Sequence, residues 1–317
     1  MRTDGLLDFH THTKHSDGHY NVSELVDDAL AHGVCALALT DHNITSGLPE
    51  FNAYCKEKGL FNIPFGTEIH AEVPSNVVTP TDNDAPDMVI LGRNPKVDVM
   101  KDYYKILLEH RVERFFPKTI TGLESIGFYF PHVELDENHP EILGVPKIFH
   151  DFVKERDNMN ILKSYVQGID SSIPEQDIRK DPVRFINKYC YAVGRPAYVK
   201  RLEGFSVDDA VSFADVLNCK LFIAHPGGEY GWLSDGVLNY FIEHKVPGIE
   251  VRSYFNSPEQ NRKFDDMAKK HSLIRSGGSD CHGYIGPNAA FKIGIHDRPQ
   301  NQLPKDILEE LWYSLPQ

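Results

Sequence analysis

Long hydrophobic runs are missing from this sequence. The longest apolar stretch is Val34–Leu39, far shorter than the roughly 20 residues that a membrane-spanning helix needs. The first five residues lead directly into a strand-like segment, without the apolar stretch of a secretory signal. We therefore expect a protein without a membrane span, with the cytoplasm as its compartment.

Cysteine and basic residues are also scarce. The five cysteines are scattered and form no CxxC pair, which excludes a zinc ribbon and indicates reduced thiols rather than a disulfide framework. Lys and Arg number 33 against 46 Asp and Glu, and the formal net charge of −13 argues against an extended nucleic-acid-binding surface. With 41% hydrophobic residues, the 317-residue chain can form one large α/β domain or two smaller ones.

Strand-like and helix-like segments alternate along most of the chain. Helical periodicity over Val22–Leu30 stops at Gly33, and the buried-type strand Val34–Thr40 follows. This alternation predicts an α/β fold with a parallel sheet or a closed barrel. The other predicted strands are Leu6–His10, Phe61–Ile69, Met88–Leu91, Lys220–Ala224, Gly248–Val251 and Leu273–Ser276, and the other predicted helices are Pro49–Lys58, Val207–Leu217, Val237–His244 and Pro258–His271.

Residues 93–204 break this alternation. They begin with a long amphipathic stretch and continue with aromatic and charged segments that contain several prolines. We expect residues 1–92 and 205–317 to form the α/β domain, and residues 93–204 to form a mostly helical insertion that caps it and contributes to its pocket. Basic residues outnumber acidic ones between Arg179 and Arg201, where Asp181 is the one acid. That segment is either a solvated helix face or a binding surface for anions.

Residues that can bind metals stand where predicted strands end. In (β/α) barrels the loops after the strands converge on one face, and strand residues two positions apart point to the same side. Paired ligands from several strands can therefore face one centre. These residues are His10 and His12 after the first strand, Asp41 and His42 after the second, Glu68 in the third, His225 after the fifth, and Asp280 and His282 after the last.

Each of these motifs has an ordinary structural explanation when it is taken alone. A His-x-His pair occurs by chance, Thr-Asp-His suits an Asx turn, and Ser-Asp-Cys-His suits a cap. Their joint occurrence at five strand ends instead predicts a site for more than one metal ion. Imidazole and carboxylate ligands without thiolate suit Mn²⁺, Zn²⁺ or Fe²⁺, and the sequence does not choose among them.

The same segments resemble the PHP (polymerase and histidinol phosphatase) family of metal-dependent phosphoesterases. The resemblance implies a distorted (β/α)7 barrel that holds two or three divalent ions. It further implies that His10, His12, Glu68 and Asp280 surround one ion, that Asp17, His42 and His282 surround another, and that Glu68 reaches a third site with His225. The segments that carry it are DFHTHTKHSDG (residues 8–18), LTDHN (39–43), GTEI (66–69), IAHPGG (223–228) and SGGSDCH (276–282).

The chain departs from the family pattern at the fourth predicted strand. Many members carry a histidine there as a further ligand of the third site, and this chain has Val89. Either that site is weak or absent, or a histidine of the insertion, His132 or His150, supplies the contact. His15 and His19 lie on the same turn as Asp17 and could compete with it as ligands, and the simpler interpretation is that they are solvated loop residues.

The predicted ligands suit hydrolysis by activated water. A water that bridges two metal ions would act as the nucleophile, so no side-chain nucleophile is required. Asp41 precedes the predicted ligand His42, and we expect it to orient neighbouring groups from outside the ligand set. For Asp8 we consider two roles: it orients neighbouring groups as Asp41 does, or it is a structural hydrogen-bond acceptor.

The resemblance therefore predicts an enzyme, a metal-dependent phosphoric ester hydrolase. Two other classes compete with it: a non-catalytic PHP module whose metals only hold the fold, and a metal-dependent amidohydrolase, because a barrel does not determine the reaction. Completeness of the ligand set argues against the first. The resemblance and the basic segment favour phosphate over an amide.

The insertion resembles that of PHP members acting on nucleotides, namely 3′,5′-bisphosphates or the 5′ ends of oligoribonucleotides. We therefore expect a phosphorylated small molecule or a short oligonucleotide as substrate, with histidinol phosphate and cyclic phosphodiesters as alternatives. Remote contacts position a scissile phosphate and favour substrates with a second phosphate or a nucleotide body. The candidates for these contacts are Lys147, His150, Arg195 and Lys200.

Overall fold

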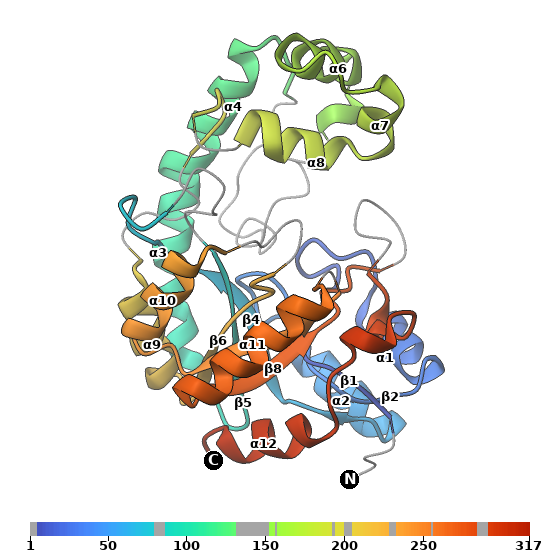
Figure 1. Ribbon diagram of the computed structural model, residues 1–317, viewed down its shortest axis with the longest axis vertical. Coiled ribbons are helices and arrows are strands. Elements are labelled where there is room, and N and C mark those ends of the chain that lie inside the picture. Colours follow the sequence, from blue (N-terminus) through green and yellow to red (C-terminus); the bar gives the residue numbers. More distant parts are fainter. Residues whose placement is uncertain are drawn as a thin grey trace. The chain divides into compact units, whose positions relative to one another are not determined.

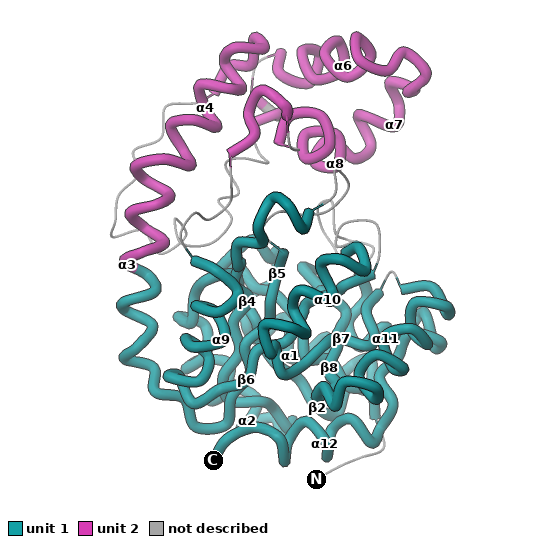
Figure 2. Tube along the Cα trace, turned by 60° about the vertical axis from the view of Figure 1, so that its left-hand side comes forward, with its two compact units in different colours: residues 1–104, 202–317 teal, residues 105–201 magenta. Residues whose placement is uncertain are grey.

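The computed structural model describes residues 5–78, 86–130, 152–155, 157–191, 194–199, 205–227, 233–254, 256–283 and 291–317. The chain divides into two compact units (Figure 2). Unit 1 consists of residues 1–104 and 202–317, and unit 2 of residues 105–201. Among the described residues, no helix combines the length and the apolar character that crossing a membrane requires.

Unit 1 has a mixed α/β architecture and contains two sheets (Figure 1). In the three-stranded sheet, β1, β2 and β3 lie side by side and are parallel. The five-stranded sheet has the order β4-β5-β6-β7-β8. The strands are β1 Leu6–Asp8, β2 Val34–Leu37, β3 Phe61–Asn62, β4 Phe65–His70, β5 Asp87–Gly92, β6 Lys220–Ile223, β7 Gly248–Ser253 and β8 Ile274–Gly278.

The segments after β1 and β2 join the two sheets. Thr11 forms a parallel bridge with Cys281, which follows β8, and His42 forms one with Glu68 of β4. Both junctions need close backbone approach at a glycine. A Cβ on Gly278 would lie 2.4 Å from the His10 nitrogen, and one on Gly66 would lie 2.2 Å from the Leu39 oxygen. The ends of β1, β2, β4 and β8 are thereby held together.

Two strand predictions need correction. The predicted strand Phe61–Ile69 is interrupted at Pro64, because β3 pairs with β2 whereas β4 pairs with β5. The prediction of parallel pairing is wrong for β5, which is antiparallel to both β4 and β6. Parallel neighbours need a long crossover, usually a helix. No helix occurs in the described part of the β4–β5 connection, residues 71–78 and 86.

The predicted helices of unit 1 are confirmed with small shifts at their ends. Capping boxes define three of their starts, at Asn21 with Glu24, at Ser206 with Asp209 and at Ser257 with Gln260. Helix α1 packs on β2, α9 on β6, α11 on β7 and α12 on β8. The helices are α1 Val22–Ala31, α2 Leu48–Lys58, α9 Val207–Val216, α10 Asp235–Glu243, α11 Pro258–His271 and α12 Asp306–Ser314, with short 3-10 helices at 97–99, 293–295 and 299–301.

Unit 2 is helical in its described part and has its own apolar core. Unit 2 begins at residue 105, within helix α3 (Met100–His110). The predicted start of the insertion, residue 93, therefore lies before this helix and still in unit 1. Phe116, Leu162 and Ile186 are fully buried in the core of unit 2. The other helices are α4 Phe116–Ser125, α6 Asn158–Ile169, α7 Glu175–Lys180 and α8 Pro182–Ile186, with a 3-10 turn at 152–154 and π-helical segments at 111–115 and 187–191.

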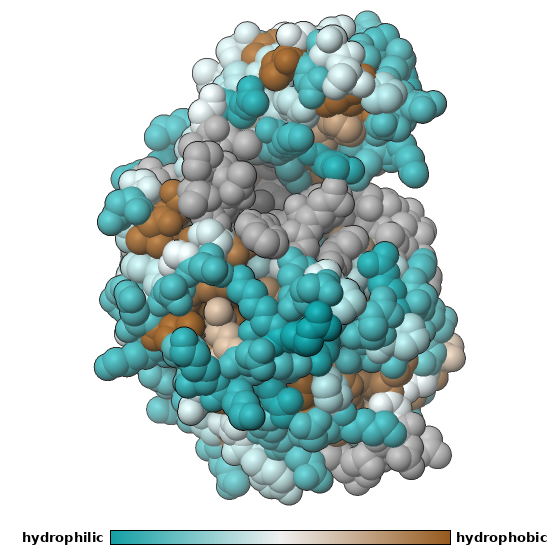
Figure 3. All heavy atoms as spheres, in the orientation of Figure 1, coloured by the Kyte–Doolittle hydropathy of each residue, from teal (hydrophilic) through white to brown (hydrophobic). Residues whose placement is uncertain are grey.

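The face drawn in Figure 3 is mostly hydrophilic, and apolar residues are scattered over it. Large hydrophobic side chains that are exposed among the described residues come from several different elements. Scattered apolar residues of this kind are normal for a globular surface and need no special explanation. They are Leu30, Val97, Ile106, Tyr129, Ile169, Val216 and Tyr313.

Asp8 links the end of β1 to β8 and to the turn near residue 294. Its fully buried carboxylate accepts hydrogen bonds from the Ser279 amide (2.8 Å) and hydroxyl (2.6 Å) and from the Gly294 amide (2.7 Å). Burial raises the pKa of Asp8 to about 6, although these donors oppose the shift. These contacts support a structural role for Asp8 rather than a role in orienting groups around the metal site.

We predict that Asp8→Ala lowers the free energy of unfolding by about 3 kcal/mol, because three buried donors lose their acceptor. Denaturant unfolding of chelator-treated protein measures this change without a contribution from bound metal. Asp98→Ala is the control, since its carboxylate is 93% exposed, and it should change stability by less than about 0.5 kcal/mol. A loss below about 1 kcal/mol for Asp8→Ala would contradict this account.

Candidate metal centre

The first ligand group lies where β1, β4 and β8 meet. His12 Nε2 is 3.2 Å from both Glu68 Oε2 and Asp280 Oδ1, and His10 Nε2 is 3.1 Å from the same Glu68 oxygen. The two Nε2 atoms are 3.1 Å apart. His10, His12, Glu68 and Asp280 each contribute one ligand atom within 4.8 Å of the others. The structure therefore brings together the four residues that the sequence assigned to one ion.

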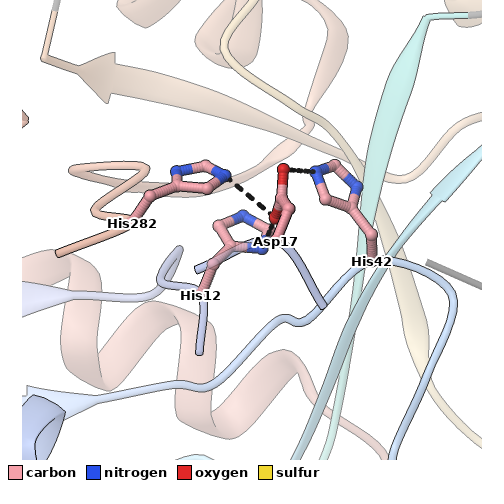
Figure 4. Close-up of side chains that lie close together, drawn as sticks. All are labelled: His12, Asp17, His42 and His282. Carbon is pink, nitrogen blue, oxygen red and sulfur yellow. Dashed lines mark ion pairs between the residues drawn. The ribbon is translucent and has the colours of Figure 1, made fainter. Parts of the chain in front are cut away.

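The second ligand group surrounds Asp17. His282 Nε2 is 3.2 Å from Asp17 Oδ1, and His42 Nε2 is 3.8 Å from Asp17 Oδ2. His12 Nδ1 lies 3.9 Å from Asp17 Oδ1, so the His12 ring faces both groups. Figure 4 shows the Asp17 carboxylate between the His42 and His282 rings. These are the residues that the sequence assigned to the second ion, with His12 added.

A third group shares Glu68 with the first. Glu68 Oε1 is 3.1 Å from His225 Nε2, while Oε2 faces His10 and His12. Asp87 at the start of β5 completes this group with Glu68 and His225. His225 therefore lies beside Glu68, where the sequence placed it.

The donor atoms fit metal ions. Within the described ranges, His12 Nδ1, His42 Nδ1 and Glu68 Oε2 are buried and have no hydrogen-bond partner. Polar atoms in that situation cost free energy unless another partner is present. Nitrogen and oxygen donors that converge without thiolate are the set that Mn²⁺, Zn²⁺ or Fe²⁺ accepts. Divalent ions would therefore satisfy groups that the protein itself leaves unsatisfied.

The sequence pattern of the PHP domain matches residues 8–170. This match covers half of the chain. The chain belongs to the PHP domain family.

Relatives of this PHP chain include a 3′,5′-nucleoside bisphosphate phosphatase of Chromobacterium violaceum. It is 28% identical over 283 residues, which cover 87% of each chain. The 5′-3′ exoribonuclease Rnm of Salmonella typhimurium is 23% identical, and the alignment covers 87% of this chain and 85% of the enzyme. The resemblance found in the sequence motifs is confirmed.

Two solved structures share the PHP chain's fold. A protein of Bifidobacterium adolescentis described as a metal-dependent phosphoesterase gives a TM-score of 0.67 at 22% identity, covering 97% of this chain and 95% of its own. An amidohydrolase of Chromobacterium violaceum, solved with sulfate and no metal, gives 0.65 at 24% identity, covering 91% and 89%. At identities below 25%, this similarity is evidence for the fold alone.

Buried charges in the PHP centre shift one another's pKa values. Burial opposes ionisation of Glu68, but the neighbouring His10 and His42 outweigh it and hold its pKa well below the usual range. Burial likewise opposes protonation of His12, but Asp280 and Glu68 raise its pKa to about 10. The pKa of His42 instead falls to about 4, because burial outweighs its acidic neighbours. Metal binding at the first group therefore displaces protons from imidazole.

Asp41 holds the loop that carries Asp17. Its carboxylate accepts hydrogen bonds from the Thr13 amide (2.7 Å), the Thr13 hydroxyl (2.6 Å) and the Ser16 hydroxyl (2.7 Å). These bonds direct the chain after His12 back toward the ligand groups. The contacts are those expected of a residue that orients its neighbours, and Asp41 belongs to none of the ligand groups within the described residues.

Glu250 is a buried acid that the sequence reasoning missed. Its Oε1 is 2.8 Å from His10 Nδ1, and its Oε2 accepts a 2.6 Å hydrogen bond from the His225 amide. A carboxylate on Nδ1 leaves Nε2 of His10 facing the ligand group, and such contacts determine which ring nitrogen can bind metal. The available signal was an acid between the apolar residues Ile249 and Val251 of strand β7.

Asp87 and His70 were missed as well. The signal for His70 was its spacing of two from Glu68, the same spacing that identified His10 with His12. Val89, where the family often has histidine, is fully buried. His132 and His150, the proposed substitutes, lie outside the described residues.

The other candidates are not among the ligand groups that the described residues form. His15 is half-buried and pairs with Ser46 Oγ at 2.8 Å, and neither it nor His19 belongs to a ligand group within the described ranges. Lys147, His150 and Lys200 lie outside the described residues. Arg195 belongs to unit 2, where its guanidinium lies 5.7 Å from the Tyr189 ring centre.

We predict that Glu250→Gln weakens metal binding by about 10- to 100-fold. A glutamine side chain has one acceptor atom, so either His10 or the His225 amide loses its partner. Titration of chelator-treated protein with Mn²⁺ in a calorimeter measures the affinity. Glu259→Gln is the control, because Glu259 is 74% exposed on α11. Equal affinities for wild type and Glu250→Gln would refute the orienting role.

Proposed function

We propose that this chain is a metal-dependent phosphoesterase that hydrolyses phosphate esters of nucleotides. The observation that carries the proposal is the position of Glu68. Its two carboxylate oxygens face different ligand groups, with His10 and His12 at 3.1 and 3.2 Å on one side and His225 at 3.1 Å on the other. A carboxylate shared in this way is what two neighbouring metal ions require.

We propose that His10, His12, Glu68 and Asp280 would hold one ion and that Asp17, His42 and His282 would hold another, as the family resemblance implies. Glu68 would also reach a third site with His225. Divalent ions at these positions supply Lewis acidity that activates water at neutral pH and stabilises the charge developing on a phosphoryl group. Asp41 and Glu250 orient the residues that hold them, through the contacts with Thr13, Ser16, His10 and His225.

We further propose that the two sheets form one distorted (β/α)7 barrel. Backbone bridges connect both edges of the five-stranded sheet to the segments after β1 and β2, Cys281 to Thr11 and Glu68 to His42. A hydrogen bond from the Asp280 amide to the His10 carbonyl (2.9 Å) extends the first junction. The ligand residues lie at these junctions, as expected for the catalytic end of a barrel.

The substrate we propose is a nucleoside 3′,5′-bisphosphate or a 5′-phosphorylated oligoribonucleotide. The names of the relatives from Chromobacterium violaceum and Salmonella typhimurium support this class. We assign the substrate contacts to Lys147, His150, Arg195 and Lys200 of the insertion, with Arg195 foremost because a guanidinium binds phosphate through two hydrogen bonds. Histidinol phosphate and cyclic phosphodiesters are the alternative substrates.

An amidohydrolase would need the same kind of metal centre, and one structural neighbour carries that description. The curated relatives, which act on phosphate esters by name, favour the phosphoesterase. A non-catalytic module is disfavoured by the ligand residues themselves. All eight residues that the family resemblance implies as metal ligands belong to the ligand groups.

We predict that Asp280→Asn lowers turnover by at least ~100-fold without unfolding the protein. Asp280 has a φ of 57°, a conformation that asparagine tolerates, so the change removes a charge and leaves the backbone unstrained. Phosphate release at saturating Mn²⁺, with circular dichroism as the folding check, measures the effect. Exposed Asp266→Asn should match wild type. Near-normal turnover of Asp280→Asn would show that the ligand assignment is wrong.

We predict that specificity constants rank nucleotide substrates above histidinol phosphate, and that Arg195→Ala lowers them by about 10-fold through the loss of a charge-assisted hydrogen bond. The panel is a nucleoside 3′,5′-bisphosphate, a short 5′-phosphorylated oligoribonucleotide, a 2′,3′-cyclic nucleotide and histidinol phosphate. Arg179→Ala is the control, because Arg179 pairs with Glu175 and is 45% exposed. A preference for histidinol phosphate would contradict the nucleotide proposal, and four unchanged constants would contradict the role of Arg195.

A further inference from the structure

Residues 43–47 form a loop that two tyrosines of α3 contact through their hydroxyls. The Tyr103 hydroxyl donates a 2.6 Å hydrogen bond to Asn43 Oδ1, and the hydroxyls of Tyr104 and Thr45 are 2.8 Å apart. The two tyrosines are consecutive residues in the part of α3 that belongs to unit 1. One helix therefore holds this loop, which we call loop 43–47, at two points.

Asn43 directly follows the ligand-group residue His42 and is held on two sides. It is fully buried with a φ of 55°, and its backbone amide donates a 2.7 Å hydrogen bond to the Glu68 carbonyl. Within the described residues, its side-chain Nδ2 has no hydrogen-bond partner. The buried amide therefore relies on the Tyr103 hydroxyl, and loss of that hydroxyl would leave it unsatisfied.

The Tyr103 ring is fixed by an aromatic cluster. Tyr103 is 1% exposed, and its ring centre lies 5.2 Å from that of Phe205 and 5.0 Å from that of Phe213. Phe213 belongs to α9, and Phe205 lies just before this helix. Aromatic pairs at these separations attract each other. The cluster therefore presents the hydroxyl from a well-packed position, and phenylalanine at position 103 would keep the ring contacts and lose only the hydroxyl.

Loop 43–47 also contacts the segment that carries Asp17. Ser46 Oγ lies 2.8 Å from Nδ1 of His15, two residues before Asp17. A Cβ on Gly47 would lie 2.9 Å from the His15 ring, so the ring packs against the loop backbone. Loop 43–47 thus connects α3 to the segment of Asp17.

The second ligand group depends on the positions of loops. Glu68 of the first group lies within β4 and is fixed by its ladder with β5. Asp17 and His42 instead lie beyond the ends of β1 and β2. Functional side chains on loops need supporting contacts to keep their geometry. The contacts of loop 43–47 therefore bear on the spacing of Asp17 and His42.

We propose that Tyr103 and Tyr104 are positioning residues for the ion of the second ligand group. Through loop 43–47 they hold the backbone next to His42, and through His15 the same loop supports the segment of Asp17. The inference rests on the proposed function, because this ion belongs to the same centre.

The test is a calorimetric titration of chelator-treated protein with Mn²⁺. Tyr103→Phe should weaken the binding of one ion by about 10-fold and leave the affinity for the others unchanged. Tyr104→Phe should act in the same direction. Tyr313→Phe is the matched control, because it makes the same chemical change on a side chain that is 77% exposed, and it should bind as wild type does.

A double-mutant cycle with Asp17→Asn identifies the affected ion. Asp17→Asn removes a carboxylate of the second ligand group, so Tyr103→Phe should have little further effect in that background. An equal loss of affinity with and without Asp17→Asn would place the action of Tyr103 outside the second group and would overturn the inference.

Binding and stability together separate positioning from a structural role. The inference is overturned if Tyr103→Phe binds every ion as tightly as wild type, whatever its stability in denaturant, or if wild type binds only one ion. Circular dichroism verifies folding, and Tyr104→Phe decides by the same criterion if Tyr103→Phe does not fold.

Phosphate release by wild type from the ester panel is measured in parallel at saturating Mn²⁺. Release together with unchanged affinities in the variant would refute the positioning role alone. Weakened binding in Tyr103→Phe, without release from any ester by wild type, would refute the proposed function and support the positioning role.

Discussion

The buried carboxylate of Glu68 is the constraint around which the centre is organised. It is fully buried, and its two oxygens face imidazoles on opposite sides. Ionised carboxylates are costly to bury unless positive charge lies close by. The ends of β1 and β2 and the segment after β6 must therefore deliver histidines to the same point, which explains why His10, His12, His42 and His225 all converge on Glu68.

Backbone contacts, rather than the ligands, hold these strand ends together. Gly66 and Gly278 allow the close approach of neighbouring segments, and Asp8 ties β1 to the segments at Ser279 and Gly294. Apart from Glu68, which lies within β4, the ligand side chains stand beyond the ends of strands, where they add little to the apolar core. This separation allows a metal centre to contain strained positions, such as the positive φ of His225 and Asp280, without endangering the fold.

The ligand groups and the second apolar core lie in different units. Every ligand group within the described residues lies in unit 1, while unit 2 has its own apolar core and the basic residue Arg195. A metal centre of this kind acts on many phosphate esters, so selection among them has to come from contacts with the rest of the substrate. We propose that the inserted unit supplies such contacts, and a unit with a core of its own can change in sequence without disturbing the metal ligands.

Local sequence determined the helices and most of the ligand residues. Helical periodicity and end signals such as Ser257 with Gln260 depend on residues three or four apart, and the spacing of His10 and His12 depends on residues two apart. Tertiary structure decided the break at Pro64, the antiparallel direction of β5, and the roles of His70, Asp87 and Glu250. Each of these depends on which strand lies alongside and in what register, and that pairing joins segments far apart in the chain, beyond the reach of any local pattern.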